Sequence, residues 1–209
     1  MAERMLLHWS PRSPFVRKVM IAAHETGLAG RIDCVRTVVG GTTPHLSLMR
    51  QNPLGRLPTL VAADGTVIHD SAVICEYFDT LADGEGLFPT AGPARLAALQ
   101  RQALGDGMME VGLLWLGERS RPDGLQSQAH IDLWRLKLRA AVDALEGEAA
   151  ALAATRFDIG LLTVGTALSY LDFRFAAEAW RDGHPALTAW HTGFDRRPSV
   201  RATLPVDDS

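Results

Sequence analysis

Cysteine is scarce in this sequence, and the placement of the few thiols excludes several kinds of site. The only two cysteines among 209 residues, Cys34 and Cys75, lie far apart and outside any C-x-x-C pair. This spacing favours two small buried thiols in a reducing compartment over a disulfide or a metal site. The 7 histidines show no H-x-x-x-H spacing either, so the sequence predicts no metal centre.

An excess of positive charge is also missing. The chain has 21 Lys and Arg against 24 Asp and Glu, a formal net charge of −3, and its arginines are dispersed. Because phosphate binding needs clustered cations, nucleic acid is disfavoured as the main partner.

Long apolar runs are absent as well. The segment Met5–Trp9 is too short for the apolar part of a signal peptide, and the alanine-rich segment Ala140–Ala154 is interrupted by acidic residues. Crossing a bilayer would need about 20 apolar residues in a row. With 47% hydrophobic and 22% charged residues, the composition is that of an ordinary globular protein. We therefore expect a cytoplasmic protein without a membrane segment.

The N-terminal part of the chain alternates strand and helix patterns. We expect a strand at Met5–Trp9, a helix between Ser13 and Gly27, and a strand over residues 32–38. Ser13 is a favourable N-cap, Pro14 suits the first helical position, and Gly27 can end the helix in a left-handed turn. The predicted order is strand, helix, strand.

A β-hairpin is predicted next. Pro58 directly precedes a short apolar strand, Thr59–Val61, and Asp64-Gly65 makes a tight turn into a strand over residues 67–69. Since Pro58 has no N–H to donate to a ladder, it belongs on an edge or at a bend.

Two helices of this part begin at a serine that could serve a ligand. Ser71 is expected to cap a second helix, residues 72–81, as Ser13 caps the first. A helix N-terminus offers unpaired N–H groups and a positive dipole end, which together attract anions. Plain capping is the better explanation for any single serine before a helix. The ligand role gains support because Ser71 follows Asp70 and Pro58 should face the same groove.

Residues 83–93, rich in glycine and proline, form the best linker in the chain. Beyond it every pattern is helical, with helices expected over residues 94–119, 127–152, 164–180 and 185–194. The sequence therefore predicts an α/β domain over residues 1–82, a linker over 83–93, and an all-helical domain over 94–209.

Three ordered segments resemble the glutathione site of cytosolic glutathione transferases, namely SPFVRK at residues 13–18, NPLGRLPTL at 52–60 and DSAVI at 70–74. The linker and helical domain fit as well, and the Ser-Pro-Phe start is similar to that of bacterial members. The resemblance implies an α/β thioredoxin-like N-terminal domain with an all-α C-terminal helical bundle, and glutathione as co-substrate.

The resemblance also implies roles for individual residues. The bond before Pro58 would be cis, and the backbone of Leu57 would pair like a strand with the cysteinyl part of glutathione. Asp70 and Ser71 would hold the γ-glutamyl end. The chemistry agrees, since a carboxylate suits the ligand's ammonium, and a hydroxyl at a helix N-terminus suits its carboxylate.

Two serines compete for the sulfur of glutathione. Ser13 stands where thioredoxin-like redox proteins keep a cysteine, and its hydroxyl at a helix N-terminus could favour the thiolate by a hydrogen bond. Ser10, at the end of the first strand, is the alternative donor. We favour Ser13.

We therefore expect a glutathione transferase that binds glutathione as a thiolate and conjugates it to a small hydrophobic electrophile, as in detoxification. Two alternatives stay open. One is a non-catalytic binding or regulatory protein of the same fold. The other is a glutathione-dependent thiol oxidoreductase, which the absence of a thiol at Ser13 and Val16 disfavours.

The helical domain supplies three further expectations from the resemblance. Gly105-Asp106-Gly107 suggests a homodimer in which Asp106 approaches the partner's γ-glutamyl site, because glycines inside a helix point to close backbone approach. Candidate linings of a second pocket are Met108, Met109, Gly112 and Trp115, with ordinary helix core or a dimer contact as the open alternative for each. The segment Thr163–Thr166 lacks the acid of the capping box found in the family, which would weaken the start of that helix.

Overall fold

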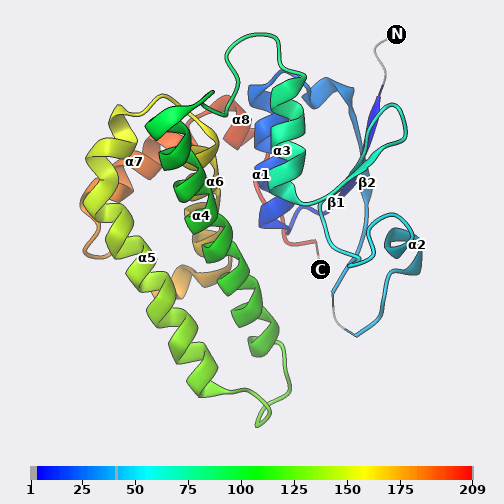
Figure 1. Ribbon diagram of the computed structural model, residues 1–209. Helices are drawn as coiled ribbons and strands as arrows, with labels where there is room; N and C mark the ends of the chain where they lie inside the picture. The colour runs from blue at the N-terminus through cyan, green and yellow to red at the C-terminus, as the bar shows by residue number, and fades with distance from the viewer. Residues whose placement is uncertain (1–3, 41, 209) are drawn as a thin grey trace. The chain divides into compact units, whose positions relative to one another are not determined.

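The computed structural model describes residues 4–40 and 42–208, so the outermost residues of the predicted domain ranges, 1–3 and 209, lie outside the described part. The chain divides into two compact units (Figure 1). One comprises Met1–Thr90 together with Pro198–Ser209, and the other comprises Ala91–Arg197.

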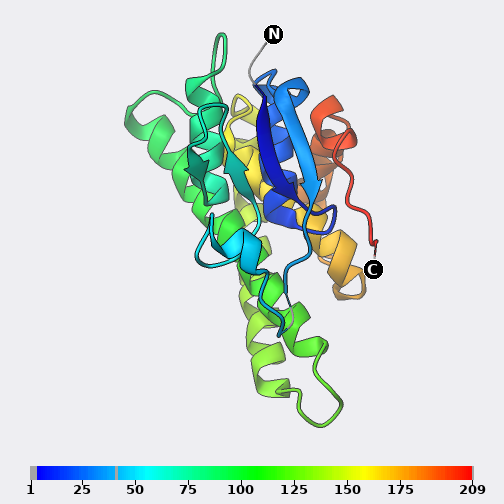
Figure 2. The ribbon, with the colours of Figure 1, turned by 90° about the vertical axis from the view of Figure 1, so that its right-hand side faces the viewer.

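The first unit is built on a four-stranded sheet in the order β2-β1-β3-β4. Its strands are β1 (Met5–Trp9), β2 (Ile32–Arg36), β3 (Thr59–Val61) and β4 (Val67–Ile68). β1 runs parallel to β2 and antiparallel to β3, and β3 and β4 form the hairpin (Figure 2). Met5 and Leu7, which point to the same face of β1, are almost fully buried.

Two helices, α1 (Pro14–Glu25) and α3 (Ser71–Thr80), pack side by side on one face of this sheet. Val19 of α1 and Ile74 and Phe78 of α3 are completely buried. The shorter elements are η1 (Ala29–Arg31) and α2 (Leu46–Met49). This β-α-β unit followed by a hairpin and a helix is the thioredoxin-like arrangement that the sequence predicted.

Local rules explain where these helices begin and end. The Oγ atom of Ser13 accepts from the N–H of Val16 at 3.3 Å, Pro14 opens α1, and Gly27 follows with φ +73°, all as predicted. The prediction for α3 was wrong by one residue. Asp70 is its N-cap, since Oδ1 accepts from the N–H of Ala72 at 2.9 Å, and Ser71 is the first helical residue.

A segment after the helical domain returns to the first unit. The helix α8 (Pro198–Arg201) packs on α1, and the hydroxyl of Ser199 donates to Glu25. Beyond α8, the carboxylate of Asp208 pairs with Arg12 and Arg36. The sequence placed residues 198–209 with the helical domain, whereas these contacts connect residues 198–208 to the first unit. No local sequence pattern predicts these contacts, because the partner residues lie 172 and 174 positions earlier in the chain.

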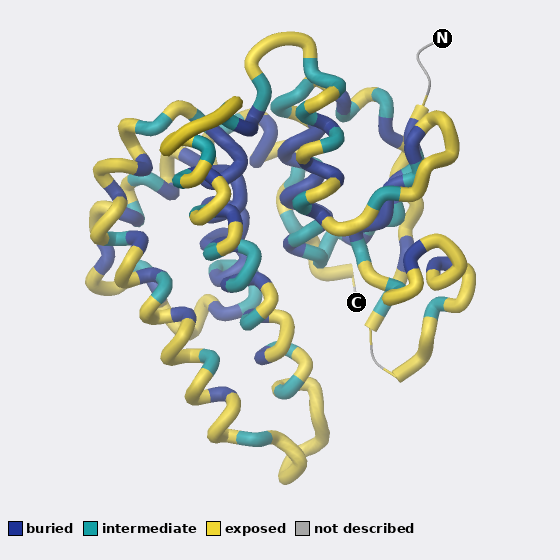
Figure 3. Tube along the Cα trace, in the orientation of Figure 1, coloured by how far each residue is buried: buried dark blue, intermediate teal, exposed yellow. Residues whose placement is uncertain are grey.

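The second unit consists of helices in its described residues, as predicted. They are α4 (Gly92–Arg119), α5 (Gln128–Ala154), α6 (Ile159–Phe175), η2 (Ala176–Glu178) and α7 (Pro185–Asp195). α6 forms the core, and nearly every residue of it is buried (Figure 3). Among the described residues, none of the helices combines the length and apolar character needed to cross a bilayer.

The prediction for α6 was wrong at both ends. Asp158 caps it by accepting from the N–H of Leu161 at 2.9 Å, so the helix begins before residue 164. It ends at Phe175 and is followed by η2 and by Ala179 at φ +45°. Thr163–Thr166 consequently lies in the helix interior, where a missing capping acid has no effect on the helix start.

Candidate functional site

The loop between β1 and α1 presents both candidate hydroxyls. Ser10 is 8% exposed, its Oγ accepts from the N–H of Arg12 at 3.4 Å, and its carbonyl accepts from the N–H of Ser13 at 3.3 Å. Ser13 is half-buried at the N-terminus of α1. Each hydroxyl accepts from the backbone and, among the described residues, donates to no other group, so its proton is available for a ligand. Ser13 also lies at the positive end of the α1 dipole.

The loop before β3 is the second part of the site. The Leu57–Pro58 peptide bond is cis, as predicted. Within the part of the chain that the structure describes, neither the N–H nor the C=O of Leu57 has a hydrogen-bond partner. An unpartnered backbone segment beside a strand can pair with an extended peptide.

Asn52 holds this loop in shape, and sequence analysis missed it. Its side chain is 3% exposed, and Nδ2 donates to the carbonyl of Arg56 at 3.2 Å and to Oγ1 of Thr59 at 3.0 Å. Oδ1 accepts from the N–H of Leu54 at 3.1 Å. The signal in the sequence was an asparagine directly before a proline, which is common in turns.

The N-terminus of α3 is the third part. Asp70 is exposed and follows a cis peptide bond after His69, while Ser71 is buried. The hydroxyl of Ser71 donates to Oδ1 of Asp70 at 3.2 Å and accepts from Nζ of Lys18 at 3.4 Å. Lys18, a buried cation of α1, was not among the predicted site residues, although a lysine in the apolar stripe of a helix was visible in the sequence.

Strand pairing brings these three parts to one end of the first unit. His8 lies opposite Thr59 in the β1–β3 ladder, so the end of β1 lies beside Pro58, and α1 begins shortly after that end. Lys18 links α1 to the start of α3. The arrangement offers, in order, two hydroxyls, a free backbone edge, and a carboxylate beside a hydroxyl.

Asp106 is not among the residues brought together in this way. It occupies a half-buried position on α4, in the other unit. The two flanking glycines differ in their surroundings. A Cβ on Gly105 would lie 2.9 Å from the backbone of Thr163, so the close neighbour of Gly105 is α6 of the same chain. A Cβ on Gly107 would meet nothing within 4 Å among the described residues.

The candidate linings of a second pocket fall into two groups. Met108 and Met109 are core residues at 3% and 0% exposure, and Gly112 packs against the ring of Tyr170. Trp115 does line a cavity of the helical unit, with a volume of about 50 Å³.

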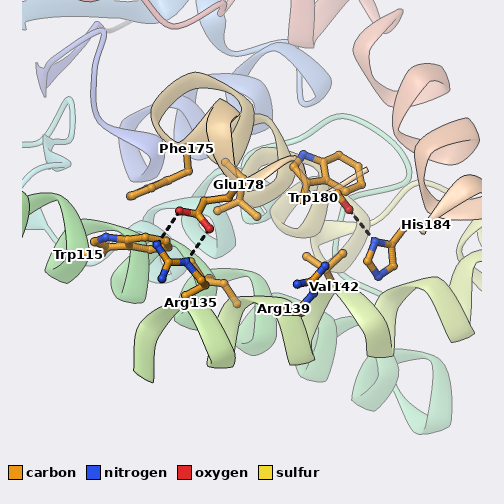
Figure 4. Close-up of a pocket in the computed structure, with 10 residues that line it drawn as sticks. Trp115, Arg135, Arg139, Val142, Phe175, Glu178, Trp180 and His184 are labelled. Atoms are coloured by element: carbon orange, nitrogen blue, oxygen red, sulfur yellow. Dashed lines mark hydrogen bonds and ion pairs between the residues drawn. The ribbon is translucent and has the colours of Figure 1, made fainter. Parts of the chain in front are cut away.

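This cavity lies between α4, α5 and the end of α6. Its walls are mostly apolar, formed by Trp115, Leu138, Val142, Leu171, Phe175 and Trp180. Figure 4 shows Arg135 facing Glu178 at one end, joined at 2.8 and 3.1 Å. His184 meets the carbonyl of Trp180 at 2.6 Å at the other end. The cavity is suited to a small apolar group.

The two thiols differ in their surroundings. Cys75 is buried, as expected, but Cys34 is exposed, because it lies on the edge strand β2, whose residues are mostly exposed. Partial burial and the nearby Asp33 raise the pKa of the Cys34 thiol, which keeps it protonated. Among the described residues no group of three or more His, Cys, Asp or Glu could hold a metal ion.

Comparison with known proteins gives a consistent result. Residues 12–81 match the family model of the glutathione S-transferase N-terminal domain, and residues 128–193 match that of the C-terminal domain. The solved structure of a glutathione transferase family member from Pseudomonas fluorescens Pf-5, with bound glutathione, is 39% identical. Its TM-score is 0.94, and the match covers 97% of this chain and 100% of that one.

Two further relatives agree. A glutathione S-transferase from Methylobacillus flagellatus KT, solved with glutathione bound, is 29% identical with a TM-score of 0.89, over 97% of this chain and 100% of that one. The uncharacterized GST-like protein YibF of Escherichia coli K12 is 29% identical over 203 residues, 96% of this chain and 98% of YibF. With matches to both domains and along nearly its whole length, this chain belongs to the glutathione transferase family.

Proposed function

We propose that this protein binds glutathione as a thiolate and conjugates it to a small hydrophobic electrophile. The observation that carries the proposal is the unpartnered backbone of Leu57 beside the cis bond to Pro58, at the same end of the unit as two helix N-termini. Two solved relatives were crystallised with glutathione, which supports the same ligand here.

The tripeptide is anchored at two points in this proposal. Its cysteinyl backbone pairs with the N–H and C=O of Leu57, as a short added strand would. Its γ-glutamyl ammonium pairs with the exposed carboxylate of Asp70, and its α-carboxylate accepts from Ser71 and the first N–H groups of α3. The buried cation of Lys18 beneath Ser71 adds positive charge at that carboxylate.

The sulfur lies at the N-terminus of α1. A hydroxyl donor and the helix dipole both stabilise a thiolate more than a thiol. We assign the donor role to Ser13 rather than Ser10, because Ser13 is more exposed and caps the helix directly. The thiol proton leaves to water, and the sulfur electron pair then forms the bond to carbon while a leaving group departs with its own pair.

The helical unit would supply the electrophile site, and an apolar cavity lined by Trp115 suits a small hydrophobic group. We further propose a homodimer, with Asp106 near the partner's γ-glutamyl ammonium, and a role in detoxification in the cytoplasm. A thiol oxidoreductase is disfavoured because serine and valine occupy positions 13 and 16. A purely binding protein is the second candidate, since the contacts above concern binding and leave turnover open.

Calorimetry with glutathione and a conjugation assay with a chloronitroaromatic test the proposal together. We expect binding and turnover in the wild type, and weaker binding in Asp70→Asn. Asp64→Asn is a matched control, because Asp64 caps the β3–β4 turn by accepting from the N–H of Thr66 at 2.8 Å, away from the proposed site. Binding without turnover would identify a binding protein, and absence of binding would reject the proposal.

A further inference from the structure

The segment that follows α8 is fastened to the loop that carries Ser10 and Ser13. The N–H of Val206 donates to the carbonyl of Pro11 at 3.3 Å. The carboxylate of Asp208 bridges two guanidinium groups, with Oδ1 3.1 Å from Nε of Arg12 and Oδ2 2.7 Å from Nε of Arg36.

The two residues held in this way stand between the two candidate hydroxyls. Pro11 and Arg12 separate Ser10 from Ser13, and the N–H of Arg12 itself donates to Oγ of Ser10 at 3.4 Å. A shift of Arg12 would therefore move the backbone that orients both hydroxyls.

Arg36 connects the same carboxylate to the rigid sheet. It is the last residue of β2 and lies opposite Trp9, the last residue of β1, in the parallel ladder. A second bond, from Nη2 of Arg36 to Oδ1 of Asp208 at 3.0 Å, makes the pair bidentate. Asp208 thus ties the β1–α1 loop to the end of the sheet.

The arrangement differs from an ordinary surface ion pair, which contributes little on its own. One carboxylate serves two arginines, and a backbone hydrogen bond fixes the same segment two residues earlier. Hydrogen bonds from Arg36 and the charges of Arg36 and Arg12 lower the pKa of Asp208, so it is ionised at neutral pH.

We propose that Asp208 is a positioning residue for the thiol of glutathione, acting through Arg12 on the turn that presents Ser10 and Ser13. This inference rests on the proposed function, because it concerns the same sulfur. It predicts that the hydroxyl donors lose their alignment when Asp208 is neutralised, although the residue touches no ligand itself.

A charge effect alone would act in the opposite direction. Removal of the Asp208 carboxylate takes this partner from Arg36 and leaves Arg12 with the longer ion pair to Asp207, at 4.0 Å. The added positive charge near the sulfur would favour the thiolate and lower the thiol pKa. Loss of hydroxyl alignment would instead raise it. The sign of the change therefore separates positioning from simple electrostatics.

The test uses Asp208→Asn in the full chain, with Asp33→Asn as matched control. Asp33 makes a comparable two-bond pair with Arg4 at the other end of β2, with Oδ2 2.7 Å from Nε. Ultraviolet thiolate absorbance against pH should show a raised thiol pKa of bound glutathione and slower conjugation in Asp208→Asn, with glutathione affinity little changed. An unchanged or lowered thiol pKa, or the same rise in Asp33→Asn, would overturn the proposal.

Hydrogen exchange without ligand keeps this test independent of the proposed function. The amide of Ser13, bonded to the carbonyl of Ser10, should exchange faster in Asp208→Asn and at the wild-type rate in Asp33→Asn. If the wild type failed to bind glutathione, faster exchange in Asp208→Asn would still show that Asp208 holds the β1–α1 loop in place. Equal exchange in all three proteins would reject it, whatever the ligand.

Discussion

The Nζ atom of Lys18 lies 3.4 Å from the Oγ atom of Ser71, and both residues are almost completely buried. Helices α1 and α3 are therefore joined beneath the N-terminus of α3. A buried cation at this point adds to the dipole end of α3 and makes the same position favourable for a ligand carboxylate.

Ser71→Ala should weaken glutathione binding without loss of the helix cap. Asp70, and not Ser71, caps α3, so the capping hydrogen bond to Ala72 stays intact. The loss of one acceptor for buried Lys18 should lower the free energy of unfolding by about 1–3 kcal/mol. Calorimetry and urea unfolding measure the two effects, with Ser120→Ala, at the exposed end of α4, as control. Unchanged glutathione affinity would contradict the assignment of Ser71.

Asn52→Ala should disturb both stability and binding. Its buried amide makes three hydrogen bonds that shape the loop before Pro58, to the carbonyl of Arg56, to Oγ1 of Thr59 and from the N–H of Leu54. We expect their loss to lower the free energy of unfolding by about 0.5–1.5 kcal/mol per hydrogen bond. The backbone of Leu57 would then lose its fixed position. Gln51→Ala at the adjacent position is the control, because it removes only one hydrogen bond, between Oε1 of Gln51 and Nε2 of His8 at 2.9 Å. Equal glutathione affinities in the two variants would show that Asn52 does not position Leu57.

The stability of the helical unit should fall in mild acid because of His191. Its ring is fully buried, and Asp195, Asp172 and Arg181 are the charged groups that face it. Burial, the largest effect, lowers the pKa of His191 below its usual 6.5, so the folded state favours the neutral ring. When folding lowers the pKa of a base, its contribution to stability is fully present at pH values above the pKa of the unfolded state. Stability then decreases as the pH falls from the unfolded-state pKa towards the folded-state pKa.

Urea unfolding between neutral pH and mild acid measures this slope. His191→Gln should be less stable than the wild type at neutral pH but should lose less stability on acidification, whereas His24→Gln, at an exposed position of α1, should keep the wild-type slope. An identical slope in His191→Gln would assign the acid sensitivity to another group.

Asp106→Asn tests the proposed shared site. Sedimentation equilibrium should show a dimer at micromolar concentration for both proteins, with weaker glutathione binding in the variant because an acid near the ligand's ammonium is neutralised. A monomeric wild type, or a dimer with unchanged affinity in the variant, would remove Asp106 from the site.

The sequence predicted the features that follow local rules. Local stereochemistry predicted Ser13 as a helix cap and Gly27 as a left-handed helix end. Family resemblance predicted the cis bond before Pro58. The cap of α3 was assigned to the wrong neighbour because Asp70 and Ser71 are both good N-caps and the sequence offers no way to separate them.

Other features depend on packing between distant segments. α6 is apolar on all sides, so hydrophobic periodicity could not define its ends. Gly105 correctly signalled close backbone approach, but the neighbour is Thr163 of α6. Asp208 contacts Arg12 and Arg36, which adjoin it only after folding, so no motif identifies it.

The ionisation of bound glutathione tests the central claim most directly. A free cysteine thiol has a pKa of about 8.5. Thiolate absorbance of glutathione bound to the wild-type protein, followed against pH, should give a lower thiol pKa, and Ser13→Ala should raise it while Ser10→Ala leaves it lowered. A shift lost in Ser10→Ala alone would transfer the role to Ser10. A thiol that titrates in the wild-type complex as it does in free glutathione would contradict the claim that this protein activates glutathione.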